Sequence, residues 1–178
     1  MTVNRQSKRS KRGRKVSKTS RKPISAYVER RLWAESAGKC MNPDCRADLF
    51  ISNGDIAERA HIVPYCKNAE NTFDNLILIC PNCHTNFDKN SAFTADEVRK
   101  WKSIRHAEID RVFGKTFSSF DDLRKEAAPL LARNKSIYEN YYMKDKRRLW
   151  DVFEKEIIVN NRKLCTLFES NLCLFQNH

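Results

Sequence analysis

Short apolar runs and longer helical patterns divide the chain into a mixed first half and a helical second half. Residues 24–37 are predicted to form a helix, because apolar residues recur there at helical spacing: Tyr27, Val28, Leu32 and Trp33. Ser25 is placed to cap its start, and Gly38 is expected to end it in the left-handed conformation.

Three shorter apolar runs follow and are predicted to be strands. Residues 49–51 form the first, ended by a turn at 53–55, and residues 56–63 form the second, closed by Pro64. A polar loop over residues 67–75 contains three asparagines. The four apolar residues 76–79 then read as a buried strand.

The remainder of the chain has helical periodicity. A short helix is predicted from Cys83 to about Asp88, and the sequence from Thr94 to Glu97 is a capping box that begins an amphipathic helix ending at Gly114. Further helices are predicted at residues 120–136 with a break at Pro129, and at 146–158 and 161–174. The pattern indicates an α+β protein with a mainly helical C-terminal part.

Charge is concentrated at the N-terminus. The net charge is +12, yet residues 1–22 hold ten Lys or Arg and no acid, which leaves 24 basic against 22 acidic residues in the rest. Residues 1–23 are therefore predicted to be a disordered basic tail. Such a tail favours phosphate contacts with nucleic acid. The alternative is a tail that only keeps the protein in solution or carries a targeting signal. The cations expected to bind nucleic acid are Arg5, Lys8, Arg9, Lys11, Arg12, Arg14 and Lys15 in the tail, and Arg59 and Lys89 beyond it.

No apolar run approaches the length of a membrane span, and the N-terminus has no apolar segment typical of a secretory signal. We therefore expect a cytoplasmic protein without a membrane partner. In a reducing compartment, the seven cysteines indicate metal binding or buried thiols and not disulfides.

Four of the cysteines form two pairs that suit a structural zinc ion. Cys40 and Cys45 have a spacing within the range of zinc knuckles, and Cys80 and Cys83 have the usual spacing. Four thiolates leave no open position on zinc, so the metal would be structural. The alternative is four buried or incidental cysteines. The unpaired residues Cys66, Cys165 and Cys173 are expected to be core thiols.

Three polar residues lie near these pairs: His61 in AHIVP, Asn75 in DNL and His84 in CPNCHTNFDK. Together with the cysteines they resemble the HNH nucleases, the ββα-metal family, over about residues 26–100. The resemblance implies a zinc-stapled ββα or treble-clef module. It also implies that His61 is the general base, that Asn75 orients the loop carrying His61, and that His84 binds a catalytic divalent metal.

The chain departs from the family pattern at Ala60, where many members have a metal-binding residue. Asp88 lies four residues beyond His84, and the resemblance to colicin-type members makes it the second ligand. Asp88 could instead cap the helix or pair with Lys89, and Glu58 is a fallback ligand. A carboxylate and imidazole pair would suit Mg²⁺, Mn²⁺ or Ni²⁺.

These features predict a tail at 1–23, an HNH nuclease module at 24–114 and a helical region at 115–178 that packs or docks a protein partner. The expected activity is metal-dependent cleavage of nucleic acid, with DNA favoured, in an effector of phage defence or restriction. The alternatives are a zinc module that binds nucleic acid without cutting it, an RNA-cleaving enzyme, and a subunit that a partner activates.

Overall fold

The structure is a computed structural model that describes residues 22–52, 54–67 and 70–175 of the 178-residue chain. The predicted tail, residues 1–23, lies outside the described residues except for Lys22 and Pro23. The seven tail cations expected to bind nucleic acid lie outside them too: Arg5, Lys8, Arg9, Lys11, Arg12, Arg14 and Lys15.

Helix α1 spans Ala26–Ser36 and begins as predicted, because the Ser25 hydroxyl accepts a hydrogen bond from the Val28 N–H. The left-handed residue that ends it is Ala37 (φ 47°), and not Gly38 as predicted. Gly38 follows with φ 76°, and a Cβ atom there would lie 2.8 Å from the Phe50 ring. Glycine is thus needed at position 38 for this close approach as well as for its backbone conformation.

Two small antiparallel sheets follow α1. Strand β1 (Phe50–Ile51) pairs with β2 (Gly54–Asp55), so the predicted turn contributes two paired residues. Strand β3 (Glu58–His61) pairs with β4 (Leu76–Ile79), and His61 lies opposite Leu76. All four residues of β4 are buried, as predicted from their apolar run. The mixed α and β composition expected from the sequence is confirmed.

Helix α2 (Pro81–Asp88) follows β4 directly, and α3 (Ala95–Phe113) starts at the predicted capping box. Helix α4 (Phe120–Ile137) continues through Pro129, so the predicted break is absent. Proline removes one backbone N–H from the helix and frees the carbonyl of Lys125. Both residues are exposed, so water can solvate that carbonyl and the helix tolerates the loss.

Helix α5 (Arg147–Glu169) is one element where two were predicted, and π-helical η1 (Tyr138–Tyr142) and 3₁₀-helical η2 (Leu172–Phe175) flank it. The amide of Asn160 donates to Asn134 Oδ1 on α4 at 2.9 Å. Val159 and Asn160 are both buried. These contacts with neighbouring helices keep the chain helical across residues 159–160, where a boundary between two helices was predicted.

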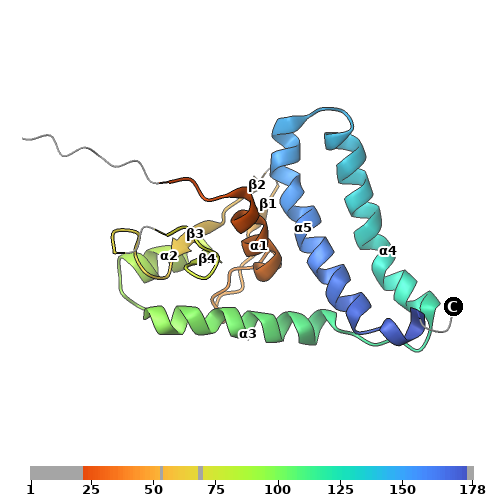
Figure 1. Ribbon diagram of the computed structural model, residues 1–178, viewed down its shortest axis with the longest axis horizontal. Helices are drawn as coiled ribbons and strands as arrows, with labels where there is room; N and C mark the ends of the chain where they lie inside the picture. Colours follow the sequence, from red (N-terminus) through yellow and green to blue (C-terminus); the bar gives the residue numbers. More distant parts are fainter. Residues whose placement is uncertain (1–21, 53, 68–69, 176–178) are drawn as a thin grey trace, which may run out of the picture.

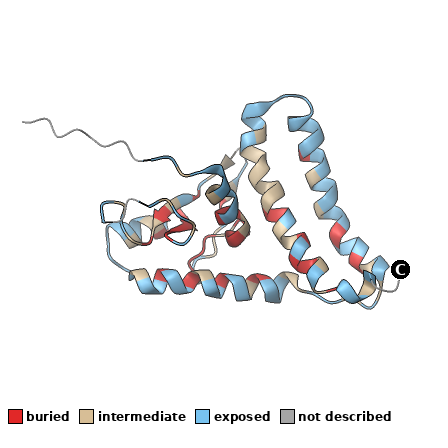
Figure 2. Ribbon diagram, in the orientation of Figure 1, coloured by how far each residue is buried: buried red, intermediate tan, exposed pale blue. Residues whose placement is uncertain are grey.

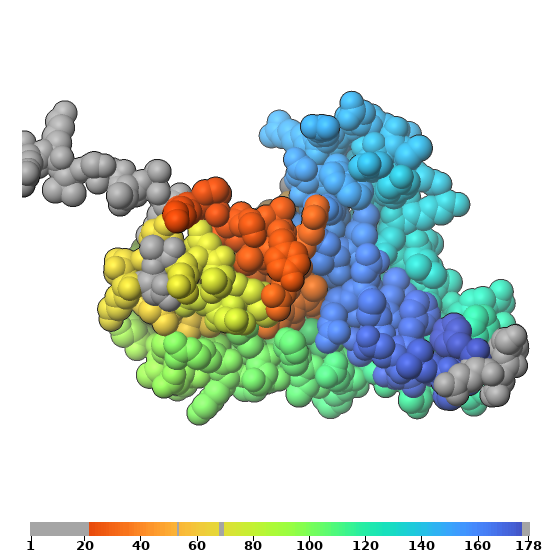
Figure 3. Space-filling model, in the orientation of Figure 1, coloured from red at the N-terminus to blue at the C-terminus, as the bar shows by residue number. Residues whose placement is uncertain are grey.

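Figure 1 shows α3 running along one side of the sheets and α1, with α4 and α5 forming a hairpin beside them. The main core combines Leu32 and Trp33 of α1, all of β4, and Val98 and Trp101 of α3 with Val159 of α5. Buried positions lie on the inner faces of these elements, whereas α4 is mostly exposed (Figure 2). The side chains of α1 and α5 meet in the space-filling view (Figure 3). Helix α5 therefore completes the core that contains β4.

The rest of the hairpin has its own small apolar cluster, made by Leu123, Ala127, Leu164 and Leu167. Among the described residues, none of the helices has the length and apolar character needed to cross a membrane.

Candidate functional site

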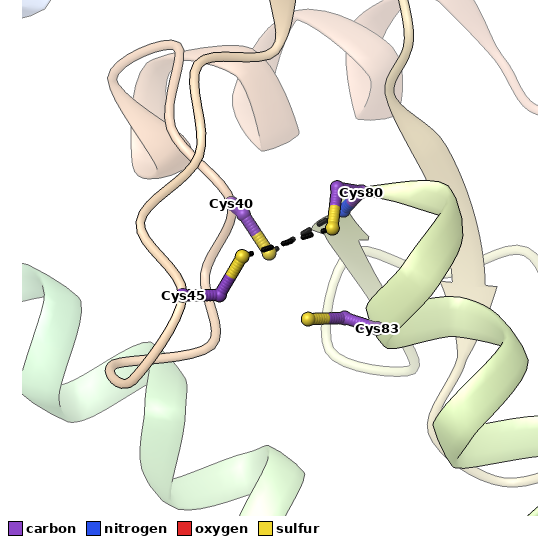
Figure 4. A group of neighbouring side chains, drawn as sticks. All are labelled: Cys40, Cys45, Cys80 and Cys83. Atoms are coloured by element: carbon purple, nitrogen blue, oxygen red, sulfur yellow. Dashed lines mark hydrogen bonds between the residues drawn. The ribbon is translucent and has the colours of Figure 1, made fainter.

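The four paired cysteines converge on one point. Cys40 and Cys45 lie in the loop after α1, while Cys80 and Cys83 lie at the start of α2 (Figure 4). Their sulfur atoms all lie within 4.8 Å of one another, and the Cys45 and Cys80 Sγ atoms are 3.8 Å apart. A tetrahedron with zinc–sulfur bonds of ~2.3 Å has edges of about 3.8 Å. The cluster therefore fits a structural zinc ion.

Hydrogen bonds to sulfur support this fit. The backbone N–H of Cys80 donates to Cys40 Sγ, and the Asn42 side-chain amide donates to Cys83 Sγ, both at 3.3 Å. Such donors stabilise thiolates bound to a metal. Burial raises the pKa of Cys40 above its usual range and that of Cys83 to about 11. Burial also acts on Cys80, but hydrogen bonds from the other cysteines outweigh it and lower its pKa. Cys40 and Cys83 therefore need a cation to ionise at neutral pH.

An arginine holds the first cysteine loop in place. The Arg46 guanidinium donates to the carbonyls of Cys40 and Met41 at 3.2 and 2.8 Å and pairs with Glu108 on α3 at 2.7 Å. The cysteine cluster thus joins the end of α1 to the start of α2, the helix that carries His84.

Both histidines line one surface pocket of about 450 Å³. His61 reaches it from the end of β3, and His84 and Asp88 reach it from α2. The pocket wall also contains Lys22, Ile24, Arg59, Pro64, Tyr65, Cys66 and Asn71. The structure therefore brings together the two imidazoles that lie 23 positions apart in the sequence.

The His61 ring has two neighbours that set its position. Its Nε2 atom lies 2.8 Å from Asn71 Oδ1. The Tyr65 ring meets it edge-on, with ring centroids 5.3 Å apart. These contacts fix the direction in which the imidazole faces the pocket.

Asn75 is buried and binds the segment that follows His61. Its Oδ1 accepts from the Val63 N–H at 2.8 Å, and its Nδ2 donates to the Val63 and Glu70 carbonyls, both at 3.2 Å. The side chain therefore joins the end of β3 to the polar loop by hydrogen bonds, with no metal required for this contact.

The turn before Asn75 is held by Lys102 of α3. Its ammonium donates to the carbonyls of Phe73 and Leu76 at 2.7 and 2.9 Å and pairs with the buried Glu35 at 3.1 Å. The Phe73 ring lies between this ammonium, at 4.0 Å, and the Arg31 guanidinium, at 3.8 Å. Burial lowers the pKa of Lys102 and raises that of Glu35.

His84 lies between two carboxylates. Asp88 Oδ2 is 3.0 Å from Nε2 of the imidazole, and Glu58 Oε2 is 3.7 Å from Nδ1. The i, i+4 spacing on α2 brings Asp88 to this position. A histidine that binds a metal through one nitrogen commonly gives its other N–H to a carboxylate, so the three residues fit one divalent cation.

Residues 40–89, less than a third of the chain, match the family model described as HNH endonuclease. The protein contains an HNH domain. Such a domain suggests nuclease activity, a nucleic-acid substrate and use of a divalent metal. Comparison with curated proteins and with solved structures gave no match. The matched span of the HNH domain includes both cysteine pairs, His61, Asn75, His84 and Asp88.

Within the HNH domain, the side chain of Ala60 points into the core. It is fully buried on β3, opposite Ile77 of β4. A longer ligand at this position would have to displace core residues. Glu58, two residues earlier on the same strand face, reaches towards His84 instead.

Two predicted nucleic-acid contacts lie in this part of the HNH domain. Arg59 lines the pocket, but its guanidinium is bound by Glu29 and Asp55. Burial opposes the charge on Arg59, and the two carboxylates outweigh this and raise its pKa. Lys89 is exposed at the end of α2. Binding of nucleic acid by either residue stays a prediction.

Several residues around the HNH domain's pocket were not identified from the sequence, above all Asn71, Lys22 and Tyr65. Asn71 is one of three asparagines in the loop 67–75, and no motif distinguishes it from the others. The prediction that Cys66, Cys165 and Cys173 are core thiols is wrong, because all three are exposed. Cys66 lines the pocket, in a loop with too few apolar neighbours to bury it.

Proposed function

We propose that this protein is a metal-dependent endonuclease that hydrolyses phosphodiester bonds of nucleic acid, with DNA favoured. The observation that carries the proposal is the shared pocket, in which His61 from β3 faces the same space as His84 and Asp88 from α2. Hydrolysis needs a base to deprotonate water and a cation near the scissile phosphate. The pocket contains residues suited to both tasks.

His61 is assigned as the general base, since an imidazole titrates near neutral pH and can take a proton from water. Asn75 is assigned a positioning role, because its amide binds the backbone at Val63, two residues beyond His61. Neither residue needs to contact the metal for this step.

His84 and Asp88 are assigned as protein ligands of the catalytic metal, and the Glu58 carboxylate lies 3.7 Å from the other nitrogen of His84. The donor set suits Mg²⁺, Mn²⁺ or Ni²⁺. When bound, the cation would neutralise charge on the phosphate and on the leaving oxygen. A zinc ion bound by the four thiolates would have no open position and would serve to hold α2 in place.

The basic tail, Arg59 and Lys89 would bind the phosphate backbone. We further propose that the protein acts in the cytoplasm, where reduced cysteines can hold zinc. A role as an effector of phage defence or restriction, with the α4–α5 hairpin docking a protein partner, is part of the same hypothesis. Exposed aromatic residues at the hairpin tip, Tyr138 and Tyr142, favour such docking.

The test of the base is His61→Ala in the full-length protein. We expect cleavage of supercoiled plasmid to fall by roughly a factor of 10² to 10⁴, the usual contribution of a general base, because water loses its proton acceptor. Zinc content and DNA affinity should not change, since His61 touches neither cysteine pair. The measurements are plasmid nicking with Mg²⁺, Mn²⁺ or Ni²⁺, the zinc-to-protein ratio and a binding titration.

A matched control is His106→Ala, because His106 lies half-exposed on α3 outside the pocket. It should cut like wild type. If His61→Ala cuts as fast as wild type, the assignment of the base is wrong. Activity of wild type in excess chelator would contradict the role of a divalent metal.

A second candidate is a zinc module that binds nucleic acid without cutting it, and the observation that favours it is Ala60, buried where many HNH nucleases have a metal ligand. A panel of double-stranded DNA, single-stranded DNA and RNA separates the candidates. Binding without cleavage of any substrate supports the module, cleavage of RNA alone supports the ribonuclease, and cleavage only with an added partner supports the activated subunit.

A further inference from the structure

A chain of two hydrogen bonds connects the N-terminal segment to His61. The Asn71 Nδ2 atom donates to the backbone carbonyl of Lys22 at 2.6 Å, and Asn71 Oδ1 lies 2.8 Å from His61 Nε2. Lys22 is also held from its other side, because its backbone N–H donates to the Tyr65 hydroxyl at 3.1 Å. All four residues line the same pocket.

The direction of each hydrogen bond follows from the first acceptor. A backbone carbonyl can only accept, so the Asn71 atom that faces Lys22 must be the amino group. The atom that faces His61 must then be the amide oxygen, which can also only accept. His61 Nε2 must therefore carry a proton. In the neutral ring, this leaves Nδ1 as the nitrogen with a free lone pair.

We propose that Asn71 is a positioning residue that fixes His61 in the Nε2–H tautomer, and that the Lys22 carbonyl fixes the orientation of the Asn71 amide. The proposal rests on the assignment of His61 as the general base. Only the unprotonated nitrogen can take a proton from water, so the tautomer decides which ring atom performs the reaction. By this assignment the base is Nδ1.

The second hydrogen bond makes the backbone at Lys22 part of the site. Residue 22 directly follows the basic segment 1–21. The backbone at the end of this segment is therefore connected to His61 by the hydrogen bonds of the Asn71 side chain. A truncation that keeps Lys22 should leave His61 unchanged, whereas one that removes residues 22–24 should free the Asn71 amide to rotate.

The experiment is ¹⁵N NMR of the histidine rings in the full-length, zinc-containing protein at pH 8, where an ordinary imidazole is neutral. The chain has four histidines, and His61→Ala identifies the His61 signals. In wild type we expect one fixed tautomer with the proton on Nε2. The Asn71→Ala variant should lose this fixed tautomer, and its His61 signals should show exchange between the two tautomers. Asn71→Asp keeps an acceptor and should retain the Nε2 proton.

The matched control is Asn140→Ala, because Asn140 lies on η1 and its side chain, within the part of the chain that the structure describes, bonds to Ser136 and Lys144, each four positions away. A His61 proton on Nδ1 in wild type would overturn the proposal. So would an Asn71→Ala spectrum in which the fixed Nε2 proton remains, or an Asn71→Asp spectrum in which it is lost.

Cleavage supplies an independent readout. Asn71→Ala should slow cleavage by roughly 10- to 100-fold, the range found when the hydrogen-bonding partner behind a metal-binding histidine is removed. Asn71→Asp should recover part of this loss. If wild type cuts no substrate but shows the fixed Nε2 proton, the proposed nuclease function fails while the tautomer assignment stands. If wild type cuts and the proton lies on Nδ1, only the inference about Asn71 fails.

Discussion

Cys40 and Cys83 keep their protons at neutral pH when no cation is present, because burial raises the pKa of both thiols, that of Cys83 to about 11. Zinc must therefore displace at least two protons when it binds. The cost of that displacement depends on pH, and this makes the cluster a pH-dependent part of the fold.

Zinc affinity is accordingly expected to rise with pH. Each displaced proton contributes about tenfold per pH unit below the thiol pKa, so two protons give about 100-fold between pH 7 and pH 8. The sign follows from the raised pKa values: as pH falls, protons compete better for the sulfurs and the metal is lost. The measurement is competition with a coloured chelator at the two pH values.

Cys66→Ser is the control, because that thiol is exposed and outside the cluster, and it should show the same pH dependence as wild type. A change in affinity of less than tenfold would contradict the two-proton account. Loss of a cluster residue, as in Cys80→Ser, should remove zinc and unfold the HNH domain.

The sequence was sufficient to propose these residues for the site, because they lie in short motifs with a recognisable spacing: the two cysteine pairs, His61, Asn75, His84 and Asp88. It could not predict Asn71, whose role depends on where the imidazole points after β3 ends. It also could not show that Glu58 reaches His84, since this depends on how β3 packs against α2.

At the level of elements, local signals were reliable where a cap or an apolar run marks a boundary. Ser25, the capping box at Thr94 and the buried run of β4 all gave correct elements. The predicted break at Pro129 was wrong because the freed carbonyl of Lys125 is exposed to water, and the predicted boundary near Asn160 was wrong because that residue bonds to α4. Contacts between α4 and α5 therefore decide the helix around Asn160.

Helix α5 links the helical region to the HNH domain through Val159, which is 3% exposed and packs in the core with β4. Val159→Ala should lower the free energy of unfolding by about 2 kcal/mol, because it removes two buried methyl groups and leaves a cavity. Urea denaturation of the zinc-containing protein measures this change.

Val112→Ala is the matched control, since Val112 is 42% exposed on α3 and should change stability by less than about 0.5 kcal/mol. If Val159→Ala leaves the unfolding of the HNH domain unchanged and destabilises the hairpin alone, residues 24–114 form an independent unit. That result would agree with the predicted division into a nuclease module at 24–114 and a helical region at 115–178.

For the molecule as a whole, the distribution of charge predicts how nucleic acid is bound. Residues 1–22 hold ten cations, whereas the remaining chain is close to neutral. Removal of residues 1–20, which takes away eight of these cations, should weaken binding and flatten its salt dependence. Each lost phosphate contact lowers the slope of log K against log salt concentration by about 0.9 for duplex DNA.

The binding measurement is best made in the His61→Ala background, so that substrate remains intact. A neutral segment of the same length in place of residues 1–20 controls for chain length. An unchanged slope of log K against log salt concentration would show that the tail only keeps the protein in solution or carries a targeting signal.

The exposed thiol of Cys66 has a practical consequence. It lies on the pocket wall, while the other two cysteines outside the cluster lie elsewhere, Cys165 on α5 and Cys173 on η2. With those two changed to serine, a fluorophore attached to Cys66 would sense the arrival of nucleic acid directly. Its emission would follow docking in real time, whether or not a strand is then broken.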